Sequence, residues 1–210
     1  MTIFNDGNFS RRSVLAGAGA VFVSGCSSIL PTPAPVQLYV LRPDMMPPAG
    51  PPVRWRLSVA APDATAALDT TRIALIRSAT TMDYYANSAW PDRAPLIVQR
   101  LMVEALESSG RIQSVDRDTA GIASDYLLET ELRNFEARYD AGGPQVLVTI
   151  QAKMVQIPER VIVASLTASQ RATAGANTVD SVVLAFDQAT GAAIAQIAGW
   201  ALALPQPAGR

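Results

Sequence analysis

The chain of 210 residues contains no histidine, a single lysine (Lys153) and a single cysteine (Cys26). Without histidine, the most common general base, the most common metal ligand and the Ser-His-Asp arrangement are all excluded. No serine precedes Lys153 at the Ser-x-x-Lys spacing, and neither a Gly-x-Ser-x-Gly elbow nor a phosphate-binding glycine loop occurs. One cysteine allows no disulfide within the chain. The sequence therefore predicts a protein that is not an enzyme and that binds no cofactor or metal ion.

Charge is also scarce, with 17 basic and 18 acidic residues. Removal of residues 1–25, argued below, takes away Arg11, Arg12 and Asp6 and leaves 15 basic and 17 acidic residues. No basic excess remains to neutralise phosphates, which excludes nucleic acid as a partner. The remaining 185 residues are enough for one domain with its own core.

The N-terminus has the parts of a secretory signal. Arg11 and Arg12 precede an apolar run over residues 14–23, and small residues follow before Cys26. A run of ten residues is too short to cross a bilayer as a helix, which needs about 20. We therefore expect residues 1–25 to be a cleaved signal peptide. The adjacent arginines fit general secretory export and twin-arginine export equally, so the route stays open.

The segment Val23-Ser24-Gly25-Cys26 resembles the lipobox of bacterial lipoproteins. The resemblance implies that Cys26 is acylated and becomes the first residue of the mature protein; an ordinary signal peptide that contains a cysteine is the alternative. Two or three acyl chains would hold the protein stably on a membrane. Serine rather than aspartate follows Cys26, which favours the outer over the inner membrane. Residues 26–35 are rich in proline and predict an extended tether.

The rest of the chain alternates between strand and helix patterns. Apolar residues recur with a period of two, which predicts strands, over Val53–Val59, Arg72–Arg77, Tyr126–Arg133 and Val146–Met154. Short strands are also expected over Val36–Leu41 and Met82–Tyr85, and a longer one over Val161–Arg171, which is rich in β-branched and small residues. Apolar stripes of helical period predict two helices, from Pro95 to a C-terminal Gly110 and from an Asn177 N-cap to Ala201.

The order of these elements predicts one α+β domain over residues 36–204, followed by a short tail at 205–210. We expect a single twisted, largely antiparallel sheet of about five to seven strands, with two amphipathic helices on one face.

Aromatic residues are few, and three of them lie close together in the sequence. Tyr84, Tyr85 and Trp90 could form an exposed contact patch for a partner, or could pack in the core. The Met45-Met46-Pro47-Pro48 segment fits an adaptable docking loop as well as simple disorder.

Carboxylates pair at two places. Glu129 and Glu131 would share one face of a strand, a placement used by glycosidases but also expected of a solvated strand beside Arg133. The Asp116-Arg117-Asp118 segment could chelate a hard cation or form a solvated turn. Carboxylates in these contexts more often face solvent, and we assign catalysis to neither.

Several segments, taken in order behind the lipobox, resemble the ABC-type transport auxiliary lipoprotein family, which includes the paraquat-inducible auxiliary lipoproteins. They are Leu38–Leu41, Leu68–Ile73, Trp90–Pro95 with the helix that follows and Arg111–Val115, Asp125–Leu128 with Phe135, and Val183–Ala189 ending at Trp200. The chain departs from the family pattern at Asp63-Ala64-Thr65, where an apolar, proline-bearing stretch is usual. No single segment is specific, but the ordered set is.

The resemblance implies a non-catalytic adaptor of an envelope ABC system that moves phospholipid or other apolar molecules. Its partners would be a mammalian-cell-entry-type substrate-binding protein, a permease and an ATPase, with the membrane held through Cys26. The resemblance places the protein on the periplasmic face of a Gram-negative envelope, and leaves homo-oligomerisation open. The alternative is a periplasmic lipoprotein that itself carries an apolar ligand between its sheet and its helices, which would require an apolar cavity there.

Overall fold

The structure is a computed structural model, and it describes residues 34–46, 49–121, 123–139 and 142–206. The fold below is that of the unit formed by residues 35–210. The predicted signal peptide and most of the predicted tether lie outside the described residues.

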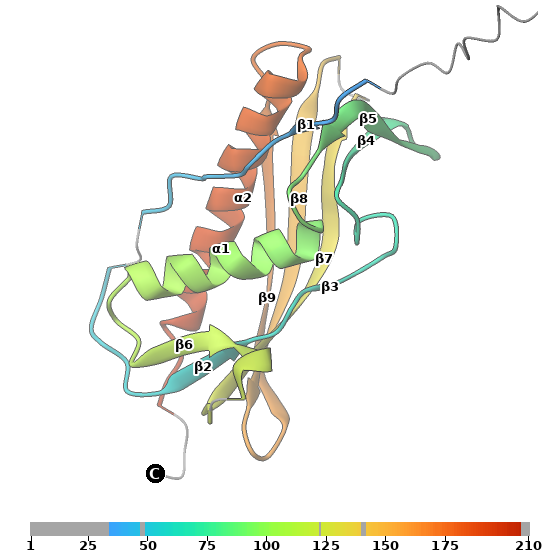
Figure 1. Ribbon diagram of the computed structural model, residues 1–210. Helices are drawn as coiled ribbons and strands as arrows, with labels where there is room; N and C mark the ends of the chain where they lie inside the picture. Colours follow the sequence, from blue (N-terminus) through green and yellow to red (C-terminus); the bar gives the residue numbers. More distant parts are fainter. Residues whose placement is uncertain (1–33, 47–48, 122, 140–141, 207–210) are drawn as a thin grey trace, which may run out of the picture. The chain divides into compact units, whose positions relative to one another are not determined.

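The described chain forms one mixed sheet and two helices, which confirms the α+β class (Figure 1). The sheet has nine strands, so the expected five to seven was too few. The strands are β1 (Gln37–Leu38), β2 (Arg56–Val59), β3 (Asp63–Ala64), β4 (Arg72–Ser78), β5 (Thr81–Ala89), β6 (Ser114–Arg117), β7 (Tyr126–Arg138), β8 (Gln145–Gln156) and β9 (Val161–Thr173). The helices are α1 (Ala94–Ser108) and α2 (Val179–Ala201), with a 3₁₀ turn at Asp118–Ala120.

Strand β7 organises the sheet. Along one edge it pairs antiparallel with β8, which pairs antiparallel with the edge strand β9. Along its other edge it pairs in parallel with β2, β3 and β4 in turn, while β6 extends the sheet from β2, and β5 and β1 extend it from β4. The two long antiparallel pairings, β7 with β8 and β8 with β9, contain most of the paired residues of the sheet. The parallel pairings come from segments far apart in sequence, which local patterns do not reveal.

Helix α1 begins and ends as the sequence predicts. Pro95 lies in its first turn, where a missing N–H costs nothing, and Gly110 follows its end with a φ of +60°. Its apolar stripe faces the sheet and is buried. The buried Gln99 amide donates to the Val59 carbonyl oxygen over 2.9 Å and so satisfies a carbonyl at the end of β2.

Helix α2 begins one residue later than predicted, because Thr178 rather than Asn177 caps it. The Thr178 hydroxyl accepts the Ser181 N–H, and Asn177 instead accepts a hydrogen bond from the Tyr139 hydroxyl. By length and composition alone α2 could cross a membrane, but 61% of its apolar window is buried inside the fold. It packs on β8 and β9 and is a core helix.

Both helices lie on one face of the sheet (Figure 1), and large side chains fill the space between them and the strands. The Trp90 ring contacts Phe186 of α2 and Phe135 of β7, with ring centroids 5.2 and 5.9 Å apart. Trp55 packs edge-on against Tyr126 at 5.3 Å. Edge-to-face contacts of this kind add to the burial of each ring.

An N-terminal strap, residues 35–46, runs beside α2 and ties the start of the domain to it. The strap pairs with β5 through β1, and further on the Arg42 N–H donates to the Asp187 carboxylate over 2.8 Å. At Gly191 the strap touches the helix backbone, since a Cβ on Gly191 would lie 2.8 Å from Pro43 Cβ. This approach gives a reason for a glycine inside a helix that glycine alone would weaken.

We expect Gly191→Val to lower the free energy of unfolding by about 1–3 kcal/mol, because the added side chain must push Pro43 and the strap off α2. Ala192→Val is the matched control, since Ala192 is exposed on the same turn. Urea denaturation of both variants tests this expectation. An equal effect of the two would mean that the strap does not press on α2.

Candidate functional site

The predicted anchor and export residues cannot be placed. Cys26, the lipobox residues Val23, Ser24 and Gly25, and the arginines Arg11 and Arg12 all lie outside the described residues. Their roles stay predictions from sequence.

The predicted aromatic contact patch does not exist as such. Trp90 is 1% exposed and belongs to the core, so its assignment as a partner contact was wrong. Tyr84 and Tyr85 are half-buried neighbours on β5, and their side chains point to opposite faces of the sheet. The three rings therefore share no common surface.

Each tyrosine has an internal partner instead. The Tyr84 hydroxyl donates to the Ala67 carbonyl oxygen over 3.1 Å, and the Arg72 guanidinium stacks 3.7 Å from its ring centre. The Tyr85 and Tyr139 hydroxyls lie 2.8 Å apart. Removal from water, and then the hydrogen bond with Tyr139, raise the pKa of Tyr85. Tyr84 is thus placed to hold β5 to the loop before β4, and Tyr85 to hold β5 to the residue after β7.

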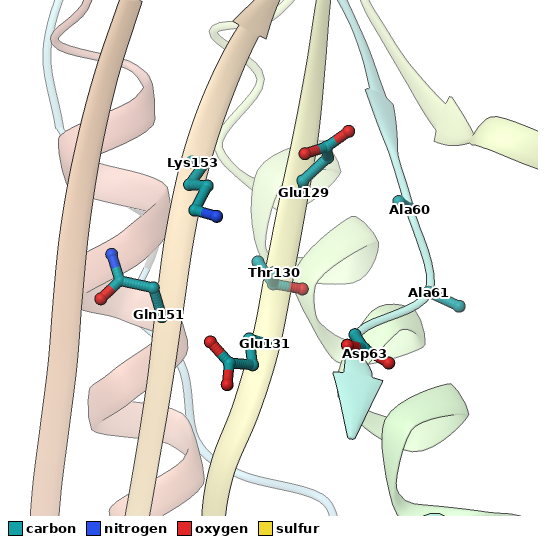
Figure 2. A pocket seen from close by; sticks show the side chains of 8 residues that line it. All are labelled: Ala60, Ala61, Asp63, Glu129, Thr130, Glu131, Gln151 and Lys153. Atoms are coloured by element: carbon teal, nitrogen blue, oxygen red, sulfur yellow. The ribbon is translucent and has the colours of Figure 1, made fainter. Parts of the chain in front are cut away.

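The carboxylates predicted to share a strand face line a pocket on the helix-free face, the side of the sheet away from α1 and α2 (Figure 2). The pocket opens where the chain leaves the edge of β7 after Val59 and returns at Asp63, so that pairing jumps from Leu128 to Glu131. Its volume is about 280 Å³. It is lined by Ala60, Ala61, Asp63, Glu129, Thr130, Glu131, Gln151 and Lys153.

Charges of both signs meet in this pocket. Glu129 is directly opposite Lys153 across β7 and β8, and Glu131 is opposite Gln151 and beside Asp63. The Glu131 carboxylate is held by the Arg133 guanidinium at 2.9 Å. In the part of the chain that the structure describes, Asp63, Glu129 and Lys153 form no ion pair within 4.0 Å. Asp63 and Lys153 are exposed, and Glu129 is half-buried.

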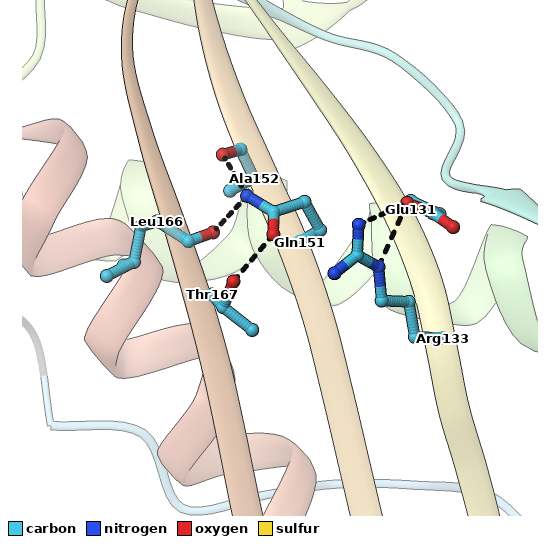
Figure 3. A network of polar contacts seen from close by, with 6 residues as sticks. All are labelled: Glu131, Arg133, Gln151, Ala152, Leu166 and Thr167. Carbon is cyan, nitrogen blue, oxygen red and sulfur yellow. Dashed lines mark hydrogen bonds and ion pairs between the residues drawn. The ribbon is translucent and has the colours of Figure 1, made fainter.

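A polar network continues the pocket towards β9 (Figure 3). The Thr167 hydroxyl donates to Oε1 of Gln151 over 2.6 Å, and Nε2 of Gln151 donates to the carbonyl oxygens of Leu166 and Ala152. The network fixes the amide in place. An open pocket of this kind can bind a polar or charged group, but it has no enclosed reaction space.

The double variant Glu129→Gln and Glu131→Gln is expected to keep its function in the cell and to unfold within about 0.5 kcal/mol of the wild type, because Glu131 is exposed and Glu129 is only partly buried. Complementation of a deletion strain, with thermal unfolding as the control for folding, measures both. A correctly folded variant without function would assign a chemical role to this pair.

The remaining carboxylates of interest lie elsewhere. Asp116 and Arg117 are at the end of β6, and Asp118 begins the 3₁₀ turn, with the Asp116 carboxylate accepting the Arg117 N–H. Among the residues with a described placement, no three His, Cys, Asp or Glu side chains gather closely enough to hold a metal ion. Asp116-Arg117-Asp118 is thus the end of a strand and a turn.

One buried carboxylate was not singled out from sequence. Glu136 of β7 is 2% exposed and faces the helix-free side, since the adjacent Phe135 packs under the helices. Its oxygens accept the Phe135 N–H and the Asn134 amide, just after a bulge in β7. Removal from water raises the pKa of the Glu136 carboxyl above its ordinary value of 4.5, although these hydrogen bonds and Arg138 act in the opposite direction.

This shift predicts a pH dependence. Because the folded state holds the Glu136 proton more tightly than the unfolded chain, this group stabilises the fold most below its ordinary pKa, and the contribution is lost as pH rises through the raised pKa. We expect the stability of Glu136→Gln to rise relative to the wild type between about pH 4 and about pH 7. Denaturation across this range tests it, with the exposed Glu131→Gln as control. A pH-independent difference would contradict it.

Comparison with known proteins identifies a family and solved structures that are similar to the domain. The model of a family described as "ABC-type transport auxiliary lipoprotein component" matches residues 38–198. The crystal structure of protein XCC0632 from Xanthomonas campestris, of family DUF330, is similar at 30% identity, with 80% of this chain and 95% of that chain covered and a TM-score of 0.76. A crystal structure titled only as an uncharacterized protein shares the fold at 16% identity and a TM-score of 0.62, over 78% of this chain and 97% of that one. No curated protein sequence matches the chain.

Proposed function

Since the chain belongs to the ABC-type transport auxiliary lipoprotein family, we propose that it is a non-catalytic accessory subunit of an ABC transport system in the cell envelope, anchored by an acylated Cys26. The observation that carries this proposal is the family match over residues 38–198, which spans nearly all of the described domain.

The finer proposal concerns cargo and partners. We propose that the system is of the mammalian-cell-entry type and moves phospholipid or another apolar molecule, with a substrate-binding protein, a permease and an ATPase as partners. The lipobox-like sequence at Cys26 and the serine after it support an anchor in the outer membrane. The tether of residues 26–35 then gives the domain reach into the periplasm.

The structure favours an adaptor over a carrier of apolar ligands. A carrier needs an apolar cavity between sheet and helices, but Trp90, Phe135 and Phe186 pack against one another in that layer. The pocket on the helix-free face is lined by alanine and polar side chains only. Such a lining suits a polar contact rather than an acyl chain.

The test is purification of the tagged, acylated protein from membranes of its own host in mild detergent. We expect mass spectrometry to identify a permease, an ATPase and a mammalian-cell-entry protein together with it. Recovery of a stoichiometric lipid on the isolated domain, without these subunits, would favour the carrier instead. Recovery of neither would contradict both.

A further inference from the structure

An apolar ridge lies on the outer side of the strap and α2. We define it by four exposed side chains: Val36, Leu38, Val40 and Leu184. Val36 and Leu184 are 58% and 62% exposed. Among the described residues, a second exposed apolar group, Val161–Val163, lies at the start of β9, far along the chain from Cys26.

Alternation along the strap produces three of the four. Leu41 is buried, and Tyr39 is half-buried and packed against the core cluster. Leu38 and Val40, which alternate with them, therefore point outward. The strap is held in this orientation by the pairing of β1 with β5 and by the Tyr39 N–H, which donates to the Ala89 carbonyl oxygen over 2.9 Å.

Helix periodicity places the fourth beside them. Asp180, Leu184, Asp187 and Gly191 are spaced by four, three and four residues, so they form one stripe of α2. This stripe faces the strap: Asp180 lies near Tyr39, Asp187 accepts the Arg42 N–H, and Gly191 touches Pro43. Leu184 lies between two of these contacts and is still open to solvent, so it adjoins Val40.

The position of the ridge in the chain indicates what covers it. Val36 is only ten residues from Cys26, and ten residues span at most about 35 Å even when fully extended. The ridge is thus the apolar surface that an anchor at Cys26 keeps nearest to the bilayer. The neighbouring Tyr39 and the exposed Arg42 are residue types that favour the headgroup region.

We propose that this ridge rests on the lipid surface to which Cys26 is anchored and so fixes the orientation of the domain on the membrane. This inference rests on the proposed function, because it requires the acyl anchor. With the ridge against lipid, the helix-free face and its pocket, on the other side of the sheet, are left open towards the periplasm and the partner proteins.

A fluorescence experiment on the full-length acylated protein tests the ridge. Since Cys26 is the only cysteine and its sulfur is acylated, an introduced cysteine is the one free thiol. Leu184→Cys on the ridge and Ser165→Cys, exposed on β9, are labelled with an environment-sensitive fluorophore. The proteins are reconstituted into vesicles of phosphatidylethanolamine and phosphatidylglycerol that contain brominated acyl chains.

We expect the label at position 184 to shift to the blue and to be quenched several-fold more strongly than the label at position 165. A second pair of proteins carries the label at Gln188→Cys, with and without Leu38→Ser and Val40→Ser. We expect the label at position 188 to be quenched in the protein without these two changes and to lose this quenching in the protein with them. Equal quenching at 184 and 165 in vesicle-bound protein would overturn the ridge alone. Protection of position 184 only after addition of the transporter subunits would overturn it in favour of a protein contact. Protein that stays in solution with an unmodified Cys26 would overturn the anchor as well.

Discussion

Replacement of Trp90 by alanine is expected to lower the free energy of unfolding by about 3–5 kcal/mol, the range for loss of a large aromatic side chain from a core. Trp90 is 1% exposed and joins the end of β5 to the sheet and to α2 through Phe135 and Phe186. Its removal leaves a cavity where three elements meet. Chemical denaturation followed by circular dichroism measures the loss, which corresponds to a fall in melting temperature of about 6–20 °C.

Two further variants serve as controls for this result. Trp90→Phe should cost much less, because it keeps most of the volume and removes a buried indole N–H that has no acceptor in the described structure. Leu184→Ala, on the exposed ridge, should have little effect on unfolding. A Trp90→Ala protein of unchanged stability that had lost a partner instead would contradict the core role and favour the alternative of a partner contact.

Periodicity and composition were sufficient to predict the two helices and the three long strands. The stripe from Val98 to Leu106 and the alternation in β8 are both strong, because each element buries one side against the other layer. Periodicity and composition were not sufficient for β3, where no strand was predicted. The strand predicted over Val36–Leu41 is present but shortened to β1. Both β1 and β3 have only two residues, and each exists only because a distant strand offers an edge, Ser88–Ala89 for β1 and Glu131–Leu132 for β3.

Strand β7 shows why side-chain direction was harder to predict. Alternation from Tyr126 to Leu132 would place Phe135 on the same side as Glu131, facing solvent. The bulge between Leu132 and Asn134 reverses this alternation, so that Phe135 enters the core and Glu136 turns to the other face. The apolar Phe135 and Ala137, out of phase with the residues before them, are the signal in the sequence.

The candidate site, too, was predictable from the sequence only in part. The shared face of Glu129 and Glu131 was predictable from their spacing, but the pocket depends on a gap between β2 and β3 that only the fold creates. The close contact of Gly191 with Pro43 also required the tertiary structure. In the same way, the sequence predicts Asn177 as the N-cap of α2, but the fold brings the Tyr139 hydroxyl to Asn177 and leaves the cap to Thr178.

The second large effect concerns the anchor, and here the expected change is nearly all-or-none. A plain Cys26→Ala change would leave an apolar signal uncut, so we combine it with Val23→Ala and Gly25→Ala, which complete an Ala-x-Ala cleavage site before position 26. We expect nearly all of this triple variant to move from the membrane fraction to the soluble periplasm. The wild type, held by two or three acyl chains, should stay membrane-bound in high salt.

We expect release to be nearly complete because helix α2, which looks capable of replacing the anchor, cannot do so. Helix α2 is long and apolar, but it is committed to the core by its packing on β8 and β9, so it is not free to enter a bilayer. The ridge of four side chains is too small to hold the domain by itself. Release should therefore occur with an unchanged melting temperature, because all three substitutions lie outside the core that α2 forms with β8 and β9. A triple variant that is cleaved, folded and still membrane-bound at high salt would show that a protein partner, and not the acylated cysteine, holds this domain to the envelope.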